Sequence, residues 1–268
     1  WMLIMNNRSQ KGFSLIELMV STVVGMIIIA GATNVYLTTI VSSSDTLKQS
    51  KLNQELSTLM SVMAGDIIRA GVTGNLDYVS PQTNAFNQID NTALEVIDNM
   101  TDNAQVAWAN ASTGGSCILY TYDADLDGVV DDGDIFGFRL NNGVVEMRQQ
   151  GDVANNTRHD SCSDSDDTWL QVTDGRLVNV TSLNFAFNNS ECINTREPND
   201  ADEDGDGTND NSGEMDCYDT APVNGSGNIT VEVRQIDITL TGQLVADASV
   251  SASLNQSVRV RNDLIRQR

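Results

Sequence analysis

The chain is poor in basic residues, histidine and proline. Its 268 residues include 15 lysines and arginines, one histidine and three prolines, against 37 aspartates and glutamates, and the net charge is −22. So acidic a surface repels polyanions, which excludes nucleic acid as a partner. With a single histidine, His159, and no cysteine pair at Cys-x-x-Cys spacing, a zinc site is not expected.

The chain also lacks the groups on which most enzymes depend. It has no glycine-rich phosphate loop. His159 lies between Arg158 and Asp160 in a polar stretch, with no nucleophile beside it in the sequence, and we expect a surface histidine there. The expectation is that the chain is not an enzyme, and an anchored hydrolase is the least favoured alternative.

Proline is absent from residue 1 to residue 80, where the pattern is helical. From Gly12 to Ser44 only Glu17 is charged. At about 1.5 Å per residue, this apolar run is longer than the roughly 30 Å of a bilayer core. Arg8 and Lys11 precede it, which predicts a cytoplasmic N-terminus. An ordinary signal peptide is less favoured, because no small-residue cleavage site follows the run and a carboxylate within it needs a partner.

A helical period continues over residues 45–71, with a single apolar stripe. The stripe consists of Leu52, Leu56, Leu59, Met60, Met63 and Ile67. The pattern predicts one helix of about 55 residues that ends near Gly71. We expect a β-sheet to cover the stripe. A coiled-coil stalk is the alternative, but the stripe spans fewer than about four heptads.

The segment Lys11-Gly12-Phe13-Ser14-Leu15-Ile16-Glu17 resembles the prepilin peptidase motif of type IV pilins and type II secretion pseudopilins. The resemblance implies a leader over 1–12, cleavage between Gly12 and Phe13, and N-methylation of Phe13. It also implies that Glu17 acts in assembly, where its carboxylate pairs with the N-terminal amine of a neighbouring subunit. A buried carboxylate needs such a cation. Residues 1–4 are expected to precede the natural start at Met5.

Asp66-Ile-Ile-Arg69-Ala-Gly71 resembles the segment that closes this helix in PilW-like minor pilins, and it is similar to the J-type minor pseudopilins. The resemblance implies a minor pilin in type IV pilus assembly or initiation. The implied partners are other pilin subunits, the prepilin peptidase and the inner-membrane assembly platform. The implied location is the bacterial inner membrane, as a single-pass protein with a periplasmic head, and then the pilus or its tip. A minor pseudopilin of type II secretion and a pilin-anchored calcium-dependent adhesin remain alternatives.

Residues 72–268, which we call the head, read as strands joined by polar loops. Strand patterns occupy 93–97, 117–122, 135–140, 144–148, 177–188, 229–241 and 257–260. Asn141-Asn142-Gly143 predicts a hairpin turn. The predicted fold class is therefore α+β. A long N-terminal helix, membrane-spanning over 13–44 and amphipathic over 45–71, packs on an antiparallel β-sheet head with calcium-binding loops.

The first acidic loop, residues 123–134, has the spacing of an EF-hand-type calcium loop. The predicted ligands are the side chains of Asp123, Asp125, Asp127, Asp131 and Asp134 and the carbonyl of Val129. Gly128 allows the turn between them. Because strands flank the loop, we expect a calcium site on a β scaffold. A solvated acidic turn is the alternative.

The second acidic loop fits the same spacing in two registers, one from Asp200 and one from Asp202. The candidate ligands are Asp200, Asp202, Asp204, Asp206, Thr208 and Asp210. The sequence does not choose between the registers. One or two calcium ions are expected to neutralise the clustered acids and to order both loops, so that folding of the head depends on them.

The four cysteines are an even number in a chain with an export signal, which indicates disulfides. They are Cys117, Cys162, Cys192 and Cys217. Cys192 and Cys217 bracket the second acidic loop, so we expect the pairs Cys192–Cys217 and Cys117–Cys162, one of three possible connectivities.

Overall fold

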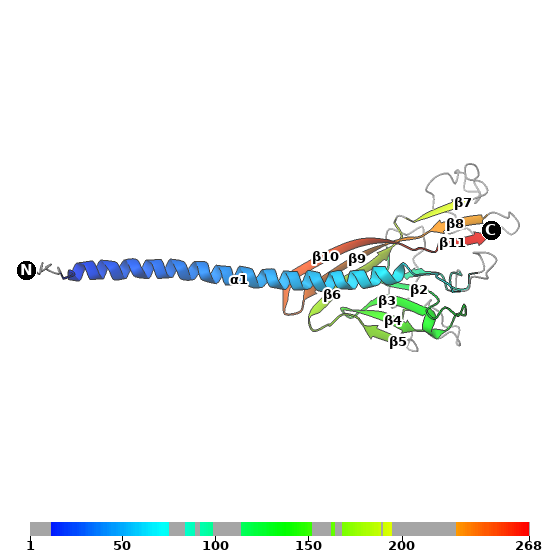
Figure 1. Cartoon of the computed structure of the whole chain (residues 1–268), viewed down its shortest axis with the longest axis horizontal. Helices are drawn as coiled ribbons and strands as arrows, with labels where there is room; N and C mark the ends of the chain where they lie inside the picture. Colours follow the sequence, from blue (N-terminus) through cyan, green and yellow to red (C-terminus); the bar gives the residue numbers. More distant parts are fainter. Residues whose placement is uncertain are drawn as a thin grey trace, which may run out of the picture. The chain divides into compact units, whose positions relative to one another are not determined.

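The computed structural model describes residues 12–74, 84–88, 92–98, 114–151, 162–163, 168–188, 190–194 and 229–267. The chain divides into two compact units, Trp1–Lys48 and Gln49–Arg268. The elements, labelled in Figure 1, are α1 (Leu15–Ile67), β1 (Glu95–Ile97), β2 (Cys117–Thr121), the 3₁₀ turn η3 (Asp132–Asp134), β3 (Ile135–Asn141), β4 (Val144–Gln150), β5 (Thr168–Gln171), β6 (Val178–Ala186), β7 (Glu191–Asn194), β8 (Ile229–Val233), β9 (Gln235–Leu244), β10 (Asp247–Arg259) and β11 (Leu264–Gln267).

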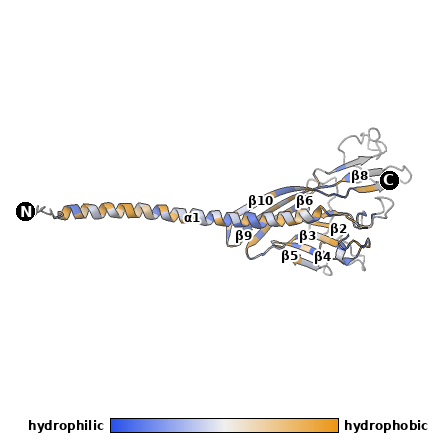
Figure 2. Cartoon of the chain, in the orientation of Figure 1, coloured by the Kyte–Doolittle hydropathy of each residue, from blue (hydrophilic) through white to orange (hydrophobic). Residues whose placement is uncertain are grey.

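The first unit contains the apolar part of α1. Figure 2 shows this part of the helix mostly in the colours of apolar residues. Its large side chains are exposed on all sides, as at Ile16, Ile27 and Val41. By length and composition α1 is a helix that can cross a membrane. Exposing so much apolar surface to water is unfavourable, so this part of the chain needs lipid or other helices around it.

In the second unit, one face of α1 forms part of the hydrophobic core. The buried helix residues are Leu52, Leu56, Leu59, Met60, Met63, Ala64 and Ile67, which include every member of the predicted stripe. They share the core with strand residues such as Ile118, Phe138 and Ile238. Truncating a core leucine or methionine to alanine costs about 2–5 kcal/mol. The α+β fold class, with one long helix and antiparallel sheets, is confirmed.

The first sheet has the strand order β1-β2-β3-β4-β5, and all its pairs are antiparallel. The β3–β4 hairpin turns at Asn142 and Gly143, whose φ angles are 49° and 82°. Positive φ at both central residues is the requirement of a type I′ turn, so the predicted hairpin is present. This turn sets the register in which Arg139 lies opposite Glu146.

The other two sheets have the orders β10-β9-β6 and β11-β8-β7. The predicted strand 229–241 is divided at Arg234 into β8 and β9, which belong to different sheets. At this point the amide of Val260 donates to the carbonyl of Arg234 at 2.9 Å. Strands β5, β7 and β11 were not predicted, and β10 is far longer than the predicted 257–260. The Ser, Ala, Asn and Gln residues of β10 have low β propensity, so its pairing with β9 outweighs the local preference.

The end of α1 is tied to β2. The residues after Ile67 form tighter turns, in which the backbone amide of Arg69 donates to the carbonyl of Asp66 and that of Ala70 donates to the carbonyl of Ile67. Gly71 follows with φ +76°, a conformation that favours glycine, and its amide donates to the carbonyl of Thr121 at 2.8 Å. The predicted end near Gly71 therefore has a steric cause.

Asp66 fastens this end of α1 to the sheet through two tyrosines. Its carboxylate accepts hydrogen bonds from the hydroxyls of Tyr120 at 2.6 Å and Tyr122 at 3.0 Å. Arg69 lies 3.4 Å from Asp66 and 3.9 Å above the Tyr122 ring. Burial raises the pKa of both tyrosines, and the neighbouring carboxylate raises it further, so both hydroxyls remain protonated donors at neutral pH.

We expect Asp66→Ala to destabilise the second unit by about 1–3 kcal/mol for each hydroxyl left buried without an acceptor. Thermal unfolding of the purified full chain in detergent, followed by circular dichroism, measures the loss. The matched control is Asp45→Ala, an exposed acid on the same helix that pairs with Lys48 at 3.5 Å; its effect should stay within about 0.5 kcal/mol. Equal melting temperatures for the two variants would contradict the role given to Asp66.

Candidate functional site

The predicted processing residues lie together at the start of α1. Gly12 and Phe13 precede the first helical residue, and no atom lies within 4 Å of the position that a Cβ on Gly12 would take. Phe13 is 84% exposed. The peptide bond between these two residues is therefore outside the helix and open.

Glu17 is an exposed acid in the first turn of α1. Its carboxylate accepts a hydrogen bond from the amide of Ser14 at 3.5 Å. A negative charge is favourable at a helix N-terminus, because the first amides there have no helical partner. The single bond still leaves most of the carboxylate open to a cation from another molecule.

The first acidic loop joins β2 to β3 and gathers three carboxylates. One oxygen from each of Asp123, Asp125 and Asp134 lies within 4.8 Å of the others. Asp123 and Asp134 are each 2% exposed, and Asp125 is exposed. Like charges at this separation repel one another, so the cluster favours a bound cation.

Backbone amides hold the two buried carboxylates in place. Asp123 accepts from the amides of Gly74 at 2.7 Å, Gly128 at 2.9 Å and Asp127 at 3.1 Å. Asp134 accepts from Ala124 at 2.8 Å and from Asp131 at 3.0 Å. Burial raises the pKa of Asp134, the two amides lower it, and the carboxylates of Asp131 and Asp123 raise it. Each oxygen has two lone pairs, so one that accepts an amide can also bind a cation.

The other predicted ligands of this loop lie outside the group of three. Asp127 accepts from the amide of Val129 at 2.7 Å, and Asp131 accepts from the amide of Gly133 at 2.8 Å, as the cap of η3. Val129 is 62% exposed. Gly128 has φ +80°, the turn for which the sequence predicts glycine. The arrangement suits an oxygen-coordinated ion such as calcium, with three carboxylates from the chain.

Several predicted residues lie outside the described residues. They are His159, Cys217 and the whole second acidic loop with Asp200, Asp202, Asp204, Asp206, Thr208 and Asp210. Cys192 lies in β7. The predicted calcium site in the second loop and the Cys192–Cys217 pair stay predictions.

The predicted pair Cys117–Cys162 is present as a disulfide, and both cysteines are fully buried. Beside it, Arg139 donates to the carbonyl of Cys162, contacts Glu146 at 2.7 Å and lies 4.1 Å above the Trp169 ring. This cluster was not predicted from the sequence. The Asn142–Gly143 turn was the available signal, because it fixes the register that places Arg139 opposite Glu146.

Removal of this disulfide by Cys117→Ala with Cys162→Ala is expected to lower the stability of the head by about 4 kcal/mol in the chain-entropy model. The loop that it closes spans a sequence separation of 45 residues. Thermal unfolding of the purified full chain measures the loss. Adding a reductant to the double variant tests for a further disulfide, because any additional loss of stability must then come from another cysteine pair. An unchanged midpoint in the double variant would show that this crosslink does not stabilise the fold.

A family model for the prokaryotic N-terminal methylation motif matches residues 7–33. A second model, described as prepilin peptidase-dependent protein B, matches residues 45–260 and thus most of the remaining chain. The chain belongs to the prepilin peptidase-dependent protein B family. No curated protein and no solved structure matches the chain.

The N-terminal features of the structure agree with membership of the prepilin peptidase-dependent protein B family. The methylation motif over residues 7–33 includes the open segment at Gly12 and Phe13, and the exposed apolar part of α1 fits membrane anchoring. The chain is thus a pilin-like protein with an N-terminal methylation motif.

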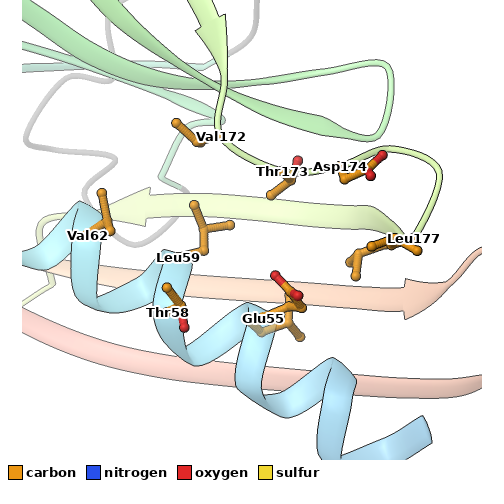
Figure 3. A pocket seen from close by; sticks show the side chains of 10 residues that line it. Glu55, Thr58, Leu59, Val62, Val172, Thr173, Asp174 and Leu177 are labelled. Carbon is orange, nitrogen blue, oxygen red and sulfur yellow. The ribbon is translucent and has the colours of Figure 1, made fainter.

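A cavity in this prepilin peptidase-dependent protein lies between α1 and the connection from β5 to β6 (Figure 3). Its volume is about 250 Å³, and its lining is Glu55, Leu56, Thr58, Leu59, Val62, Val172, Thr173, Asp174, Leu177 and Val178. The polar part of the lining consists of the hydroxyls of Thr58 and Thr173 and the carboxylates of Glu55 and Asp174.

Proposed function

We propose that this chain is a minor pilin that takes part in the assembly or initiation of a type IV pilus. The observation that carries the proposal is the apolar part of α1, which exposes large side chains all round and contains one acid, Glu17. A membrane can cover this surface before assembly, and the helices of sister subunits can cover it afterwards. The proposed role is structural packing, without catalysis.

The proposed sequence of events starts in the bacterial inner membrane, with a single-pass chain and a periplasmic head. The prepilin peptidase cleaves between Gly12 and Phe13, and the new N-terminus is methylated. The chain then passes through the inner-membrane assembly platform into the pilus or its tip. In the packed helices the carboxylate of Glu17 lies against the terminal amine of a neighbour, because a buried acid in apolar surroundings is costly without a cation.

We also propose that calcium stabilises the head. Asp123, Asp125 and Asp134 supply oxygen ligands for one ion in the first acidic loop. The second acidic loop supplies the ligands for a second ion. The convergence of the three carboxylates supports the first ion. When bound, the ion neutralises charges that otherwise repel one another. The residues on both sides of Asp123 then gain stability, since its carboxylate also holds the amides of Gly74 and Gly128.

Fractionation of sheared pili tests the proposed assembly role. We expect mass spectrometry to find this chain in the filament fraction, with methylated Phe13 as its first residue. The control is the same analysis of a strain that lacks the prepilin peptidase, where the chain keeps its leader and stays in the membrane. Two results together would contradict the type IV assignment and favour the type II secretion system. The processed chain would be absent from sheared pili, and deletion of its gene would abolish protein secretion but not piliation.

A further inference from the structure

β10 forms one edge of its sheet and pairs with β9 along most of its length. The register joins Ser251 to Gln243 and continues without a break to Arg259 opposite Gln235. In the part of the chain that the structure describes, no strand pairs with the other side of β10. The opposite edge of the same sheet is different, because β6 bridges to the first sheet at Phe185 and Gly115, and Val180 donates to the carbonyl of Gly143.

Resting on the pilin-like assembly role proposed above, we propose that the outer edge of β10 binds an extended strand from the acidic head of another pilin-like subunit. The bonds are backbone hydrogen bonds, because alternate residues of an edge strand point their amides and carbonyls away from the sheet.

The edge lacks the features by which proteins normally block such pairing. Natural edge strands are short or contain lysine, proline or inward-pointing charges. β10 has 13 residues, and its charged residues, Asp247 and Arg259, are its two terminal residues. Between them, the exposed residues are Ala248, Ser249, Ser251, Ser253, Asn255, Gln256 and Ser257, all small or uncharged. An unguarded edge of this length is an aggregation hazard unless a partner covers it.

The two faces of the sheet are already satisfied, which leaves the edge as the open hydrogen-bonding surface. One face packs into the core through Val250 and Val258. On the other face, Ser253 shares a hydrogen bond with Thr241 at 2.9 Å, and Ser257 donates to Asp237. In the first part of β10, the carbonyl of Ser251 accepts a hydrogen bond from the side-chain amide of Gln49 at 3.4 Å. The free stretch is therefore 252–259.

Charge indicates what kind of partner the edge binds. The chain as a whole has a net charge of −22, yet residues 248–267 contain Arg259, Arg261 and Arg266 against the single acid Asp263. Arg259 pairs with Asp263 at 3.5 Å, but both Arg259 and Arg261 are exposed. Acidic heads repel one another over most of their surface, but this edge attracts them. The partner is thus the acidic head of another pilin-like subunit.

Two adjacent proline substitutions locate the outward amides. In an antiparallel pair, successive residues alternate between an amide that bonds the neighbouring strand and one that points outward. Asn255 and Gln256 are both exposed. We expect one of Asn255→Pro and Gln256→Pro to lower the melting temperature of the full chain by several degrees, and the other to leave it within about 2 °C, because proline is tolerated where the amide faces away from the sheet.

Crosslinking in pilus-assembling cells then tests the partner. A photoreactive p-benzoylphenylalanine replaces Ser253 in the full chain, and the matched control replaces Thr181, an exposed residue on β6 of the same sheet. We expect Ser253 to crosslink to a head peptide of a chain that carries a prepilin motif, and Thr181 to give less than a tenth of the yield. The proline variant that keeps its melting temperature should reduce the Ser253 yield at least tenfold.

A charge-reversed variant covers the case in which both prolines unfold the head. Arg259→Glu with Arg261→Glu should lower the crosslink yield severalfold without changing the melting temperature. The edge proposal is wrong if no pilin-like head is crosslinked, or if both the tolerated proline and the charge reversal leave the yield unchanged. The amount of the chain in sheared pili is measured in parallel. A chain present in pili without the crosslink overturns the edge proposal alone, whereas a chain absent from pili overturns the assembly role.

Discussion

Glu17→Ala is expected to reduce incorporation of the protein into sheared pili at least about a hundredfold, while cleavage and membrane insertion continue. Losing one partner of a buried ion pair costs about 3–5 kcal/mol, because the other charge stays buried without compensation. Each 1.4 kcal/mol is about a factor of ten. Glu17 is exposed in the single chain, with a bond from Ser14 at 3.5 Å, so the loss arises when a neighbouring amine is buried beside it.

The controls for Glu17 separate charge from helix stability. Glu17→Gln keeps the size of the side chain and the bond from Ser14, so an intermediate loss is expected if the charge matters. Asp45→Ala removes an exposed acid from the same helix, beyond the apolar run, and should leave incorporation unchanged. Wild-type incorporation of Glu17→Ala would end the proposal that the carboxylate pairs with a neighbour's amine.

Chelation of calcium is expected to lower the melting temperature of the purified full chain by roughly 5–10 °C. An ion present at about 100 times its dissociation constant stabilises by about 2.7 kcal/mol, and each kcal/mol shifts a unit of this size by about 2–4 °C. Differential scanning calorimetry with and without chelator measures the shift. A midpoint that is the same with calcium and with chelator would show that the head does not depend on the ion.

Two aspartate variants test which carboxylates bind in the first loop. Asp125→Asn should remove the part of the shift that comes from this loop without destabilising the calcium-free protein, because Asp125 is exposed and accepts from Asp127 at 3.2 Å. Asp127→Asn is the matched control, since its carboxylate lies outside the group of three. Equal shifts in the wild type and in Asp125→Asn would contradict binding at Asp123, Asp125 and Asp134.

A third variant in this loop is expected to act even without calcium. Asp123→Ala removes the acceptor of three amides, at Gly74, Gly128 and Asp127. Because the amide of Asp123 also donates to Val72 at 2.9 Å, the loop is joined to the chain that leaves α1. Calcium bound to the first loop would therefore stabilise the chain that follows the helix as well as the loop itself.

Features with a local cause could be predicted from the sequence. The processing motif is contiguous, the apolar run and stripe of α1 follow the helical period, and Gly71 and Asn142–Gly143 take positive φ angles that few other residues adopt. The paired cysteines gave the Cys117–Cys162 disulfide as one of three connectivities. Each of these depends on neighbouring residues or on counting, so one chain was enough to predict them.

Tertiary structure alone decided the features that depend on pairing between distant segments. Spacing put six oxygens in one calcium loop, whereas the fold brings the carboxylates of Asp123, Asp125 and Asp134 together. The Asp66 contacts with Tyr120 and Tyr122 join residues more than 50 positions apart. The length of β10 was hidden for the same reason: its residues have little strand preference of their own, and β9 imposes the extended conformation by pairing.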